Sequence, residues 1–339
     1  MLALRRGVVL AAGDPGGPMQ ELEVRLGADR RPAVADVALV GASQMGDDVI
    51  VNVAALDLEL DSGGFDIVHA NLTRGLDGAG TPGAHVMKLN YTSLQHAVVP
   101  VESTAPAGVP LVLPSRAPVA ICVLHGQLAP LAWAFGRAAP GARLGYVQTT
   151  GGALPGALSE TVPLLRERGL IAAHVTAGQA FGGEADAIST AGALQHGFAE
   201  RHWHAAVCGP GPGVLGSGTA LGHAGMVALE SAHNAAALGC QVVVCPRQSS
   251  SDPRPRHRGT SHHTRTMLEL ALVPFVVAHA GERPRAGLGR HEWRQGEADL
   301  DGYAASGLPA RTMGRSLEED PDFFAAALAA GTVLAQCAA

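Results

Sequence analysis

The second part of the chain alternates apolar runs with helical patterns, and this alternation limits the fold more than any other feature. The sequence predicts helices at 128–138, 158–168 and 185–201, a long Ala-rich helix after Thr219, and another beginning near Ser261. The predicted strands are 119–124, 144–148, 170–175, 204–208, 241–246 and 272–278. Strands that are apolar throughout are typical of a parallel sheet covered by helices on both faces. We therefore predict a Rossmann-like, mostly parallel three-layer α/β domain over residues 119–280.

The segments on either side of this domain have a different character. Residues 1–103 contain six short strand-like runs separated by turn signals, which indicates a small antiparallel β-barrel or sandwich. Residues 104–118 hold four prolines and are predicted to be a linker. Residues 281–339 form a C-terminal extension, and its uncharged end, 323–339, is predicted to be a helix docked on the body rather than a membrane anchor.

Composition excludes several classes of function. The formal net charge is -6, which argues against a general nucleic-acid binder. Lys88 is the only lysine, so no phosphate-binding P-loop exists and no other residue could form a Schiff base. The five cysteines contain no C-x-x-C pair and three lie in apolar runs, which indicates a reducing compartment. We expect a cytoplasmic protein.

A glycine-rich loop follows the predicted strand at 204–208 and precedes the Ala-rich helix. Its glycines spell G-x-G-x-x-G, the pattern of dinucleotide-binding loops, in the strand-to-helix context that the pattern requires. Backbone N–H groups in such a loop can hold an anion, although similar turns also close crossovers without binding anything. The predicted ligand-binding residues of this loop are Gly211, Gly213, Gly216, Ser217, Gly218 and Thr219.

The loop after the next strand, 247–261, is rich in arginine, serine and histidine. Because ligands bind outside the carboxyl ends of parallel strands, we expect it to face the glycine-rich loop. Arginine forks and serine hydroxyls suit a phosphate or carboxylate, and histidines in the first turn of a helix are favoured in the neutral form. The further predicted ligand-binding residues are Arg247, Ser249, Arg254, Arg256 and Arg258, with Thr149, Thr150 and Gly151 from an earlier loop. The predicted catalytic residues are His223, His257, His262, His263 and Glu230.

Metal and nicotinamide sites were weighed against the same residues. His257, His262 and His263 could be supplemented by His223, Glu230 and His233, but neither H-E-x-x-H nor a zinc-binding Cys/His spacing occurs, so no metal is predicted. For NADP, the strand after the glycine-rich loop leads to Arg247, which would suit a 2′-phosphate. The late position of the loop in the sheet argues against this cofactor.

Four segments resemble a bacterial family catalogued as domain of unknown function 3866. They are GYVQTTGGALPGALSETVPLL (145–165), GPGPGVLGSGTALGHAG (209–225), RHRGTSHHT (256–264) and TMGRSLEEDPDFF (312–324). The family pattern carries an acidic residue where Thr150 stands here, so no acid role is assigned to this position. The resemblance implies the two-part architecture and no particular activity.

These patterns lead to one main functional expectation with two alternatives. We expect a small phosphorylated or otherwise anionic molecule to bind at the carboxyl edge of the sheet, where histidines could supply acid–base catalysis. The first alternative is a sensor or scaffold that binds the same anion without chemistry, and the second is an NADP-dependent oxidoreductase. Neither nucleic acid nor membrane is an expected partner, and assembly into a homo-oligomer is left open.

Overall fold

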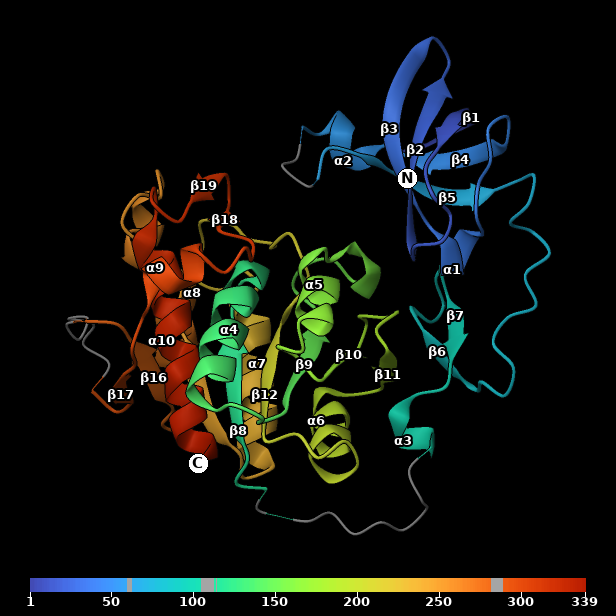
Figure 1. Ribbon diagram of the computed structural model, residues 1–339. Coiled ribbons are helices and arrows are strands. Elements are labelled where there is room, and N and C mark those ends of the chain that lie inside the picture. The colour runs from blue at the N-terminus through green and yellow to red at the C-terminus, as the bar shows by residue number, and fades with distance from the viewer. Residues whose placement is uncertain (60–62, 105–112, 114, 282–288) are drawn as a thin grey trace. The chain divides into compact units, whose positions relative to one another are not determined.

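The computed structural model divides the chain into two compact units, Met1–Val99 and Pro100–Ala339 (Figure 1). It describes residues 1–59, 63–104, 113, 115–281 and 289–339. Most of the predicted linker, 105–112 and 114, lies outside the described residues. The described part that precedes it, α3 (Val101–Thr104), belongs to the second unit.

The first unit is built around a closed five-stranded barrel with the order β1-β2-β3-β5-β4. Its strands are β1 (Leu4–Ala12), β2 (Met19–Leu26), β3 (Asp29–Asp36), β4 (Asp48–Asn52) and β5 (Asp66–Asn71). Alternate residues of these strands, such as Val24, Val49 and Val51, fill the barrel. The predicted barrel is confirmed, but it is not wholly antiparallel, because β3 pairs with β5 in parallel.

Four short elements complete the first unit. The helices α1 (Val37–Val40) and α2 (Ala54–Asp57) follow β3 and β4. The strands β6 (Val86–Lys88) and β7 (His96–Val98) form a separate antiparallel pair. The last of the six predicted strands, which corresponds to β6, is therefore not part of the barrel.

The second unit contains an eight-stranded, all-parallel sheet of order β11-β10-β9-β12-β8-β13-β16-β17. The strands are β8 (Pro118–Cys122), β9 (Leu144–Thr149), β10 (Ala173–Ala177), β11 (Ala185–Ala187), β12 (Ala205–Pro210), β13 (Gln241–Cys245), β16 (Val276–His279) and β17 (Glu292–Gln295). The chain runs outward from β8 to β11, returns to β12 beside β8, and then continues on the other side through β13. The parallel α/β architecture is confirmed.

Two edge strands differ from the sequence prediction. Residues 185–187, predicted to begin a helix, pair with β10 instead, and the helix begins only after Ser189, whose side chain accepts the N–H of Gly192. The C-terminal extension also contributes β17, which pairs with β16 at the other edge. Neither strand has an apolar run of its own, so only pairing with a neighbour defines it.

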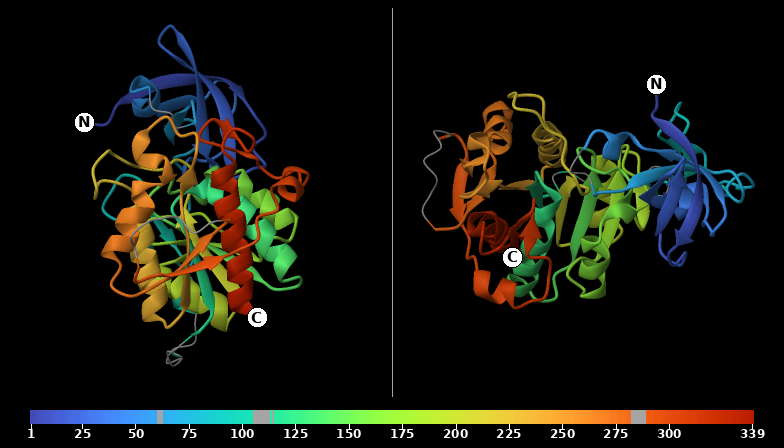
Figure 2. Two further views of the ribbon diagram at one scale, coloured as in Figure 1. Left: turned by 90° about the vertical axis from the view of Figure 1, so that its left-hand side faces the viewer. Right: turned by 90° about the horizontal axis from the view of Figure 1, so that it is seen from above.

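Helices cover both faces of this sheet. They are α4 (Leu128–Ala138), α5 (Thr161–Glu167), α6 (Thr190–Ala199), α7 (Gly225–Ala237), α8 (His262–Leu270), α9 (Leu300–Ala304) and α10 (Pro321–Ala338). Helix α4 packs against α5 and α10, and α7 packs against α6 and α8. Figure 2 shows α4 and α10 on one face of the sheet and α7 and α8 on the other.

The apolar C-terminal helix is part of the core. Within the described residues, α10 is the one helix long and apolar enough to cross a bilayer, yet most of it is buried against α4 and the strands β8, β13 and β16. Phe323, Phe324 and Leu328 are completely inaccessible. The predicted docking of this helix on the body is therefore observed.

Gly331 allows α10 to approach α4 closely. A methyl group at this position would lie 2.9 Å from Ala134 Cβ and 3.0 Å from the backbone nitrogen of Phe135, and closer still to the carbonyl of Leu131. We expect Gly331→Ala to lower the free energy of unfolding by about 1–3 kcal/mol, because the helices must separate. Urea denaturation measures the change. Gln336→Ala, at an exposed position of the same helix, is the control, and equal effects of the two variants would contradict the prediction.

Candidate functional site

The candidate site lies at the carboxyl edge of the parallel sheet, in the loops that follow β12 and β13. These strands flank β8 on its two sides, where the order of the strands reverses. Crevices at such points bind ligands in many open α/β sheets. The predicted catalytic histidines come from these two loops and from the first turn of α8, which follows the second loop.

The first half of the glycine-rich loop packs against the loop that follows β9. Ala153 N–H donates to Pro212 O at 2.7 Å, and a methyl group at Gly152 would lie 2.6 Å from Gly213 O and 2.9 Å from Pro212 O. A side chain at Gly211 would likewise meet Ala153 and Gln148. A glycine is therefore required at position 211 because two loops pack closely there, and not because a phosphate approaches the backbone.

The glycine pattern also lacks the helix spacing of a dinucleotide site. Helix α7 begins at Gly225, whereas the pattern ends at Gly216. The third glycine of the fingerprint should stand where strand and helix pack closely. The long insertion between Gly216 and α7 removes that geometry, so the structure gives no support to the NADP alternative.

Residues 215–224 form a small hairpin whose strands are joined by backbone hydrogen bonds. Ala224 N–H donates to Leu215 O at 2.9 Å, and Ser217 N–H donates to Gly222 O at 2.7 Å. At the exposed tip, the hydroxyls of Ser217 and Thr219 lie 2.8 Å apart and hydrogen bond to each other. The predicted ligand residues Ser217 and Thr219 are thus engaged in shaping the turn.

The hairpin faces the arginine–histidine loop, as the sequence predicts. A methyl group at Gly216 would lie 3.5 Å from the ring of His263, and one at Gly218 would lie 3.9 Å from Nη1 of Arg256. Gly216 also bridges to His223 on the opposite strand of the hairpin. The two predicted walls therefore meet at their histidines and at Arg256.

Local hydrogen bonds bring the arginine–histidine loop back on itself. The short strands β14 (Gln248–Ser249) and β15 (Gly259–Thr260) pair antiparallel and close the loop, which contains a single 3₁₀ turn at Pro255–His257. Ser261 caps α8 by accepting the N–H of His263 at 3.3 Å. Its Oγ also lies 2.7 Å from Nδ1 of His257. The cap thereby positions His257 beside the first turn of α8.

Four histidine rings form one cluster at this point. His223 stacks on His263 with ring centroids 4.1 Å apart and an interplanar angle of 12°. The ring centroid of His262 lies 4.5 Å from that of His263, 4.9 Å from that of His257 and 5.0 Å from that of His223. His223, His257 and His263 are buried, and His262 is half-buried. We call these four residues the histidine cluster.

The cluster is neutral at physiological pH. Burial, followed by the charges of Arg247 and Arg254, lowers the pKa of His257 to about 3. Burial, followed by the neighbouring His223 and by Arg247, lowers the pKa of His263 to about 2. Burial is also the main cause that lowers the pKa of His223 and of His262. Neutral imidazoles offer a lone pair to a proton or a metal ion.

Several ring nitrogens of the cluster lack a hydrogen-bonding partner. Among the described residues, Nε2 of His223, both nitrogens of His262 and Nδ1 of His263 are buried and unpaired. A buried polar atom without a partner costs about 1–3 kcal/mol, so such a group needs an explanation. Four of them within one group of rings indicate a site that an external molecule or ion completes.

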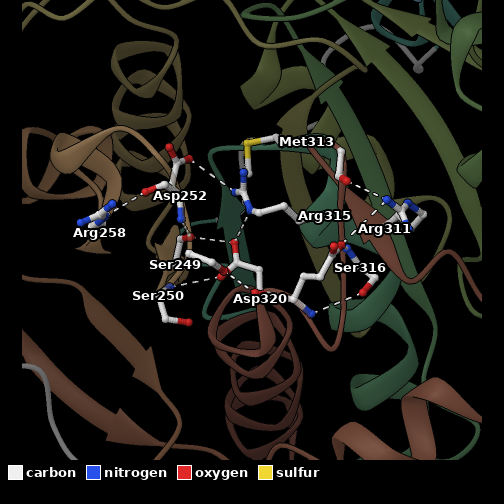
Figure 3. A network of polar contacts seen from close by, with 12 residues as sticks. Ser249, Ser250, Asp252, Arg258, Arg311, Met313, Arg315, Ser316 and Asp320 are labelled. Carbon is white, nitrogen blue, oxygen red and sulfur yellow. Dashed lines mark hydrogen bonds and ion pairs between the residues drawn. The ribbon is translucent and has the colours of Figure 1, made fainter.

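Most of the arginines that were predicted to bind a ligand contact Asp252 instead. We call the contacts around Asp252 the Asp252 network, and Figure 3 shows Asp252 with Arg258 and Arg315 beside it. Arg254 donates to both oxygens of Asp252 at 2.9 Å, and Arg247 and Arg315 lie 3.3 and 3.4 Å from Oδ2. Arg258 donates to the backbone carbonyl of Asp252 at 3.0 Å. Arg247, Arg254 and Arg258 therefore hold the loop together, and the prediction that they clamp a ligand gains no support.

The charges of this network are strongly coupled. Burial by itself would raise the pKa of Asp252, but the hydrogen bonds and charge of Arg254 hold it well below its ordinary value. Burial, with repulsion from Arg254, lowers the pKa of Arg247 to about 10, which still leaves the guanidinium charged at pH 7. The buried charge of Asp252 and the buried charge of Arg247 therefore each require the other as a counter-ion.

Arg256 differs from its neighbours. Its side chain is exposed, and it makes no hydrogen bond or ion pair with the residues that the structure describes. It lies beside the glycine hairpin and the histidine cluster. Of the arginines predicted to bind a ligand, Arg256 is the one left available.

The remaining predicted residues have structural positions. Ser249 is buried, donates to Asp320 at 2.7 Å and accepts the N–H of Asp252. Thr149, Thr150 and Gly151 form the loop under the hairpin, where Gly151 O accepts the N–H of Leu215. Glu230 is exposed on α7 and has no described contact with the histidine cluster. His233, weighed as an extra ligand, accepts the N–H of Leu272 instead.

Sequence reasoning missed the acidic partners and their source. Asp252 lies within the loop predicted to bind a ligand but is not among the predicted site residues, and no site residue is predicted in the C-terminal extension. It supplies Arg315, which bridges Asp252 and Asp320, and Met313, whose sulfur lies 3.3 Å from Arg247. The signal available in the sequence was the charged motif at 312–324, which directly precedes the uncharged end of the chain.

The fold and the histidine cluster define a two-unit α/β protein with a histidine-rich site at the carboxyl edge of its parallel sheet. Residues 32–331 match the model of the family described as protein of unknown function (DUF3866), and the chain belongs to this family. The resemblance seen in the sequence is thereby confirmed. No curated protein matches the chain, and no solved structure matches it.

Proposed function

We propose that the histidine cluster and Arg256 form the binding site of a small anionic molecule, and that the protein is an enzyme using histidine as acid or base. The observation that carries the proposal is the group of buried ring nitrogens without partners beside an unengaged guanidinium. A guanidinium forms strong paired hydrogen bonds with phosphate or carboxylate oxygens. The imidazoles next to it are neutral, and their ring nitrogens can donate hydrogen bonds to a bound molecule or accept hydrogen bonds from it.

Helix ends strengthen the preference for an anion. His262 and His263 lie in the first turn of α8, and His223 stands immediately before α7. Both helices therefore direct their partly positive N-terminal ends towards the cluster. The support for an anion comes from these local groups, because the net charge of the whole chain is negative.

The five cysteines are free thiols, and we propose the cytoplasm as the compartment.

Calorimetric titration with inorganic phosphate and with pyrophosphate tests the binding site. We expect Arg256→Ala to weaken binding at least about tenfold, because hydrogen bonds to a charged group contribute about 1.5–3 kcal/mol. Arg265→Ala is the matched control, since Arg265 is an exposed arginine on α8. Equal affinities for the wild-type protein and both variants would remove Arg256 from the site.

The catalytic part of the proposal needs a separate measurement. Mass spectrometry of the purified protein would identify a small molecule that copurifies, and turnover of that molecule is then followed with His262→Ala and His263→Ala. Retained binding with lost turnover supports an enzyme. Binding of the molecule without turnover by the wild-type protein supports the sensor alternative instead.

A further inference from the structure

The histidine cluster also has the composition of a transition-metal site. Ligand atoms of His257, His262 and His263 all lie within 4.8 Å of one another. Three imidazoles around one Zn²⁺ have Zn–N distances of about 2.0–2.1 Å, which places their nitrogens about 3.3 Å apart in a tetrahedral site. Small rotations of the three rings would therefore close them around one ion.

Two of the three rings are held in a way that suits metal binding. Ser261 Oγ, at 2.7 Å from His257 Nδ1, can accept a hydrogen bond from Nδ1–H, which leaves the Nε2 lone pair free. Such an outer partner fixes the orientation of a ligating histidine. His263 is held by the stacked ring of His223, and its buried Nδ1 lacks a partner among the described residues. Both ring nitrogens of His262 are buried without a close hydrogen-bonding partner among the described residues, and the backbone of Arg256, which acts to raise the pKa of the ring, lies beside them.

We propose that His257, His262 and His263 bind one divalent transition-metal ion of the zinc, cobalt or nickel type. Imidazole nitrogens suit these metals, whereas Mg²⁺ and Ca²⁺ require oxygen ligands. No metal is predicted from the sequence, because the ligand spacing matches neither H-E-x-x-H nor a zinc-binding Cys/His pattern. The geometry revises that view, because the loop closed by β14 and β15 brings His257 back to the start of α8.

His223 has a different role in this arrangement. Its Nδ1 accepts the N–H of Gly225 at 3.1 Å, so the proton of the neutral ring lies on Nε2. Nε2 is then a donor and can hold an oxygen of the anion instead of the metal. Three neutral ligands leave the full charge of the ion in place, which favours an anion at its open position. In this respect the inference rests on the proposed function and specifies how the anion is held.

Titration of the metal-free protein with Co²⁺, followed by visible absorption, tests the metal site without any organic ligand. We expect one equivalent to produce ligand-field bands of a low-symmetry histidine site. His262→Ala and His257→Gln should weaken Co²⁺ binding at least about 100-fold, because even the loss of an outer partner costs 10–100-fold. His196→Ala is the control, since His196 lies on α6 and pairs with Glu200.

Two results would overturn the metal site. One is the absence of a one-to-one Co²⁺ complex in the wild-type protein, and the other is unchanged Co²⁺ affinity in His262→Ala. The ring nitrogens of His262 have no close hydrogen-bonding partner among the described residues, so we expect His262→Ala to remain folded, which circular dichroism verifies. Phosphate binding is measured separately on the metal-free protein. If phosphate still binds while Co²⁺ does not, this inference fails and the proposed function stands.

Discussion

Replacing Asp252 with alanine is expected to lower the free energy of unfolding of the second unit by about 3–5 kcal/mol. Asp252 is completely buried, and Arg247, which pairs with it at 3.3 Å, is almost completely buried as well. Without the carboxylate, the guanidinium of Arg247 keeps its charge but loses its counter-ion. A buried charge without a partner is far more costly than the loss of a surface ion pair.

Arg254→Ala provides the matched control for this prediction. Arg254 makes the shortest pair with Asp252, at 2.9 Å, but its side chain is 44% exposed. Its removal leaves Asp252 paired with Arg247 and Arg315, so we expect a loss of less than about 1 kcal/mol. Urea denaturation followed by tryptophan fluorescence measures both variants, because all three tryptophans, at 133, 203 and 293, lie in the second unit. Similar losses for the two variants would refute the central role of Asp252.

The Asp252 variant should also change the candidate site. The network holds the loop that carries His257, so loosening it separates His257 from His262 and His263. We therefore expect weaker Co²⁺ binding in Asp252→Ala under conditions in which the protein remains folded. Arg254→Ala should retain the metal affinity, because the other two arginines keep Asp252 in place.

Acidification from about pH 6.5 to pH 4 is expected to destabilise the second unit by several kcal/mol. His125 and His174 lie in a second, separate group of buried rings, in which Tyr146 stacks on His174 and approaches His125. Burial lowers the pKa of His125 to about 4, although the carbonyl of Pro210 opposes the shift. Burial, followed by the charges of His125 and Arg166, lowers the pKa of His174 to about 4.

Acid lowers the stability because the unfolded state takes up protons at a higher pH than the native state does. Both histidines titrate near 6.5 in the unfolded chain, so between pH 6.5 and 4 the unfolded state binds more protons than the native state. Stability is therefore complete above pH 6.5 and is lost as the pH falls towards the native pKa. A difference of 2.5 pKa units corresponds to about 3 kcal/mol for each ring.

His174→Gln tests this assignment. Glutamine cannot titrate and can still donate to Gln148, the partner of His174 at 3.0 Å. We expect the variant to lose less stability between pH 6.5 and pH 4 than the wild-type protein. His202→Asn, at an exposed position, should leave the pH dependence unchanged. An unaltered profile in His174→Gln would show that other groups cause the acid sensitivity.

The sequence predicted which histidines meet at the site, but it did not predict which arginines are already paired with a carboxylate. Strand-ending loops on a parallel sheet must meet at one edge, so His223, His257, His262 and His263 were correctly placed together. The same reasoning grouped the arginines as a clamp, since charge alone does not distinguish a bound arginine from a free one. Asp252 engages Arg247, Arg254 and Arg258, and it is joined by Arg315, which lies 63 positions away along the chain.

The sequence by itself determined a small β domain, the parallel sheet and the buried terminal helix, because period, apolar runs and capping residues are local signals; the choice of a barrel over a sandwich needed the structure. Local signals also predicted that a helix begins near Ser261, although both Thr260 and Ser261 were possible caps and only the structure assigns the cap to Ser261. Only the tertiary structure decided that the glycines at 211–213 pack against a second loop, that α7 begins at Gly225, and that His257 returns to α8. These features depend on contacts between segments that are far apart in the chain, and such contacts leave no periodic pattern in either segment.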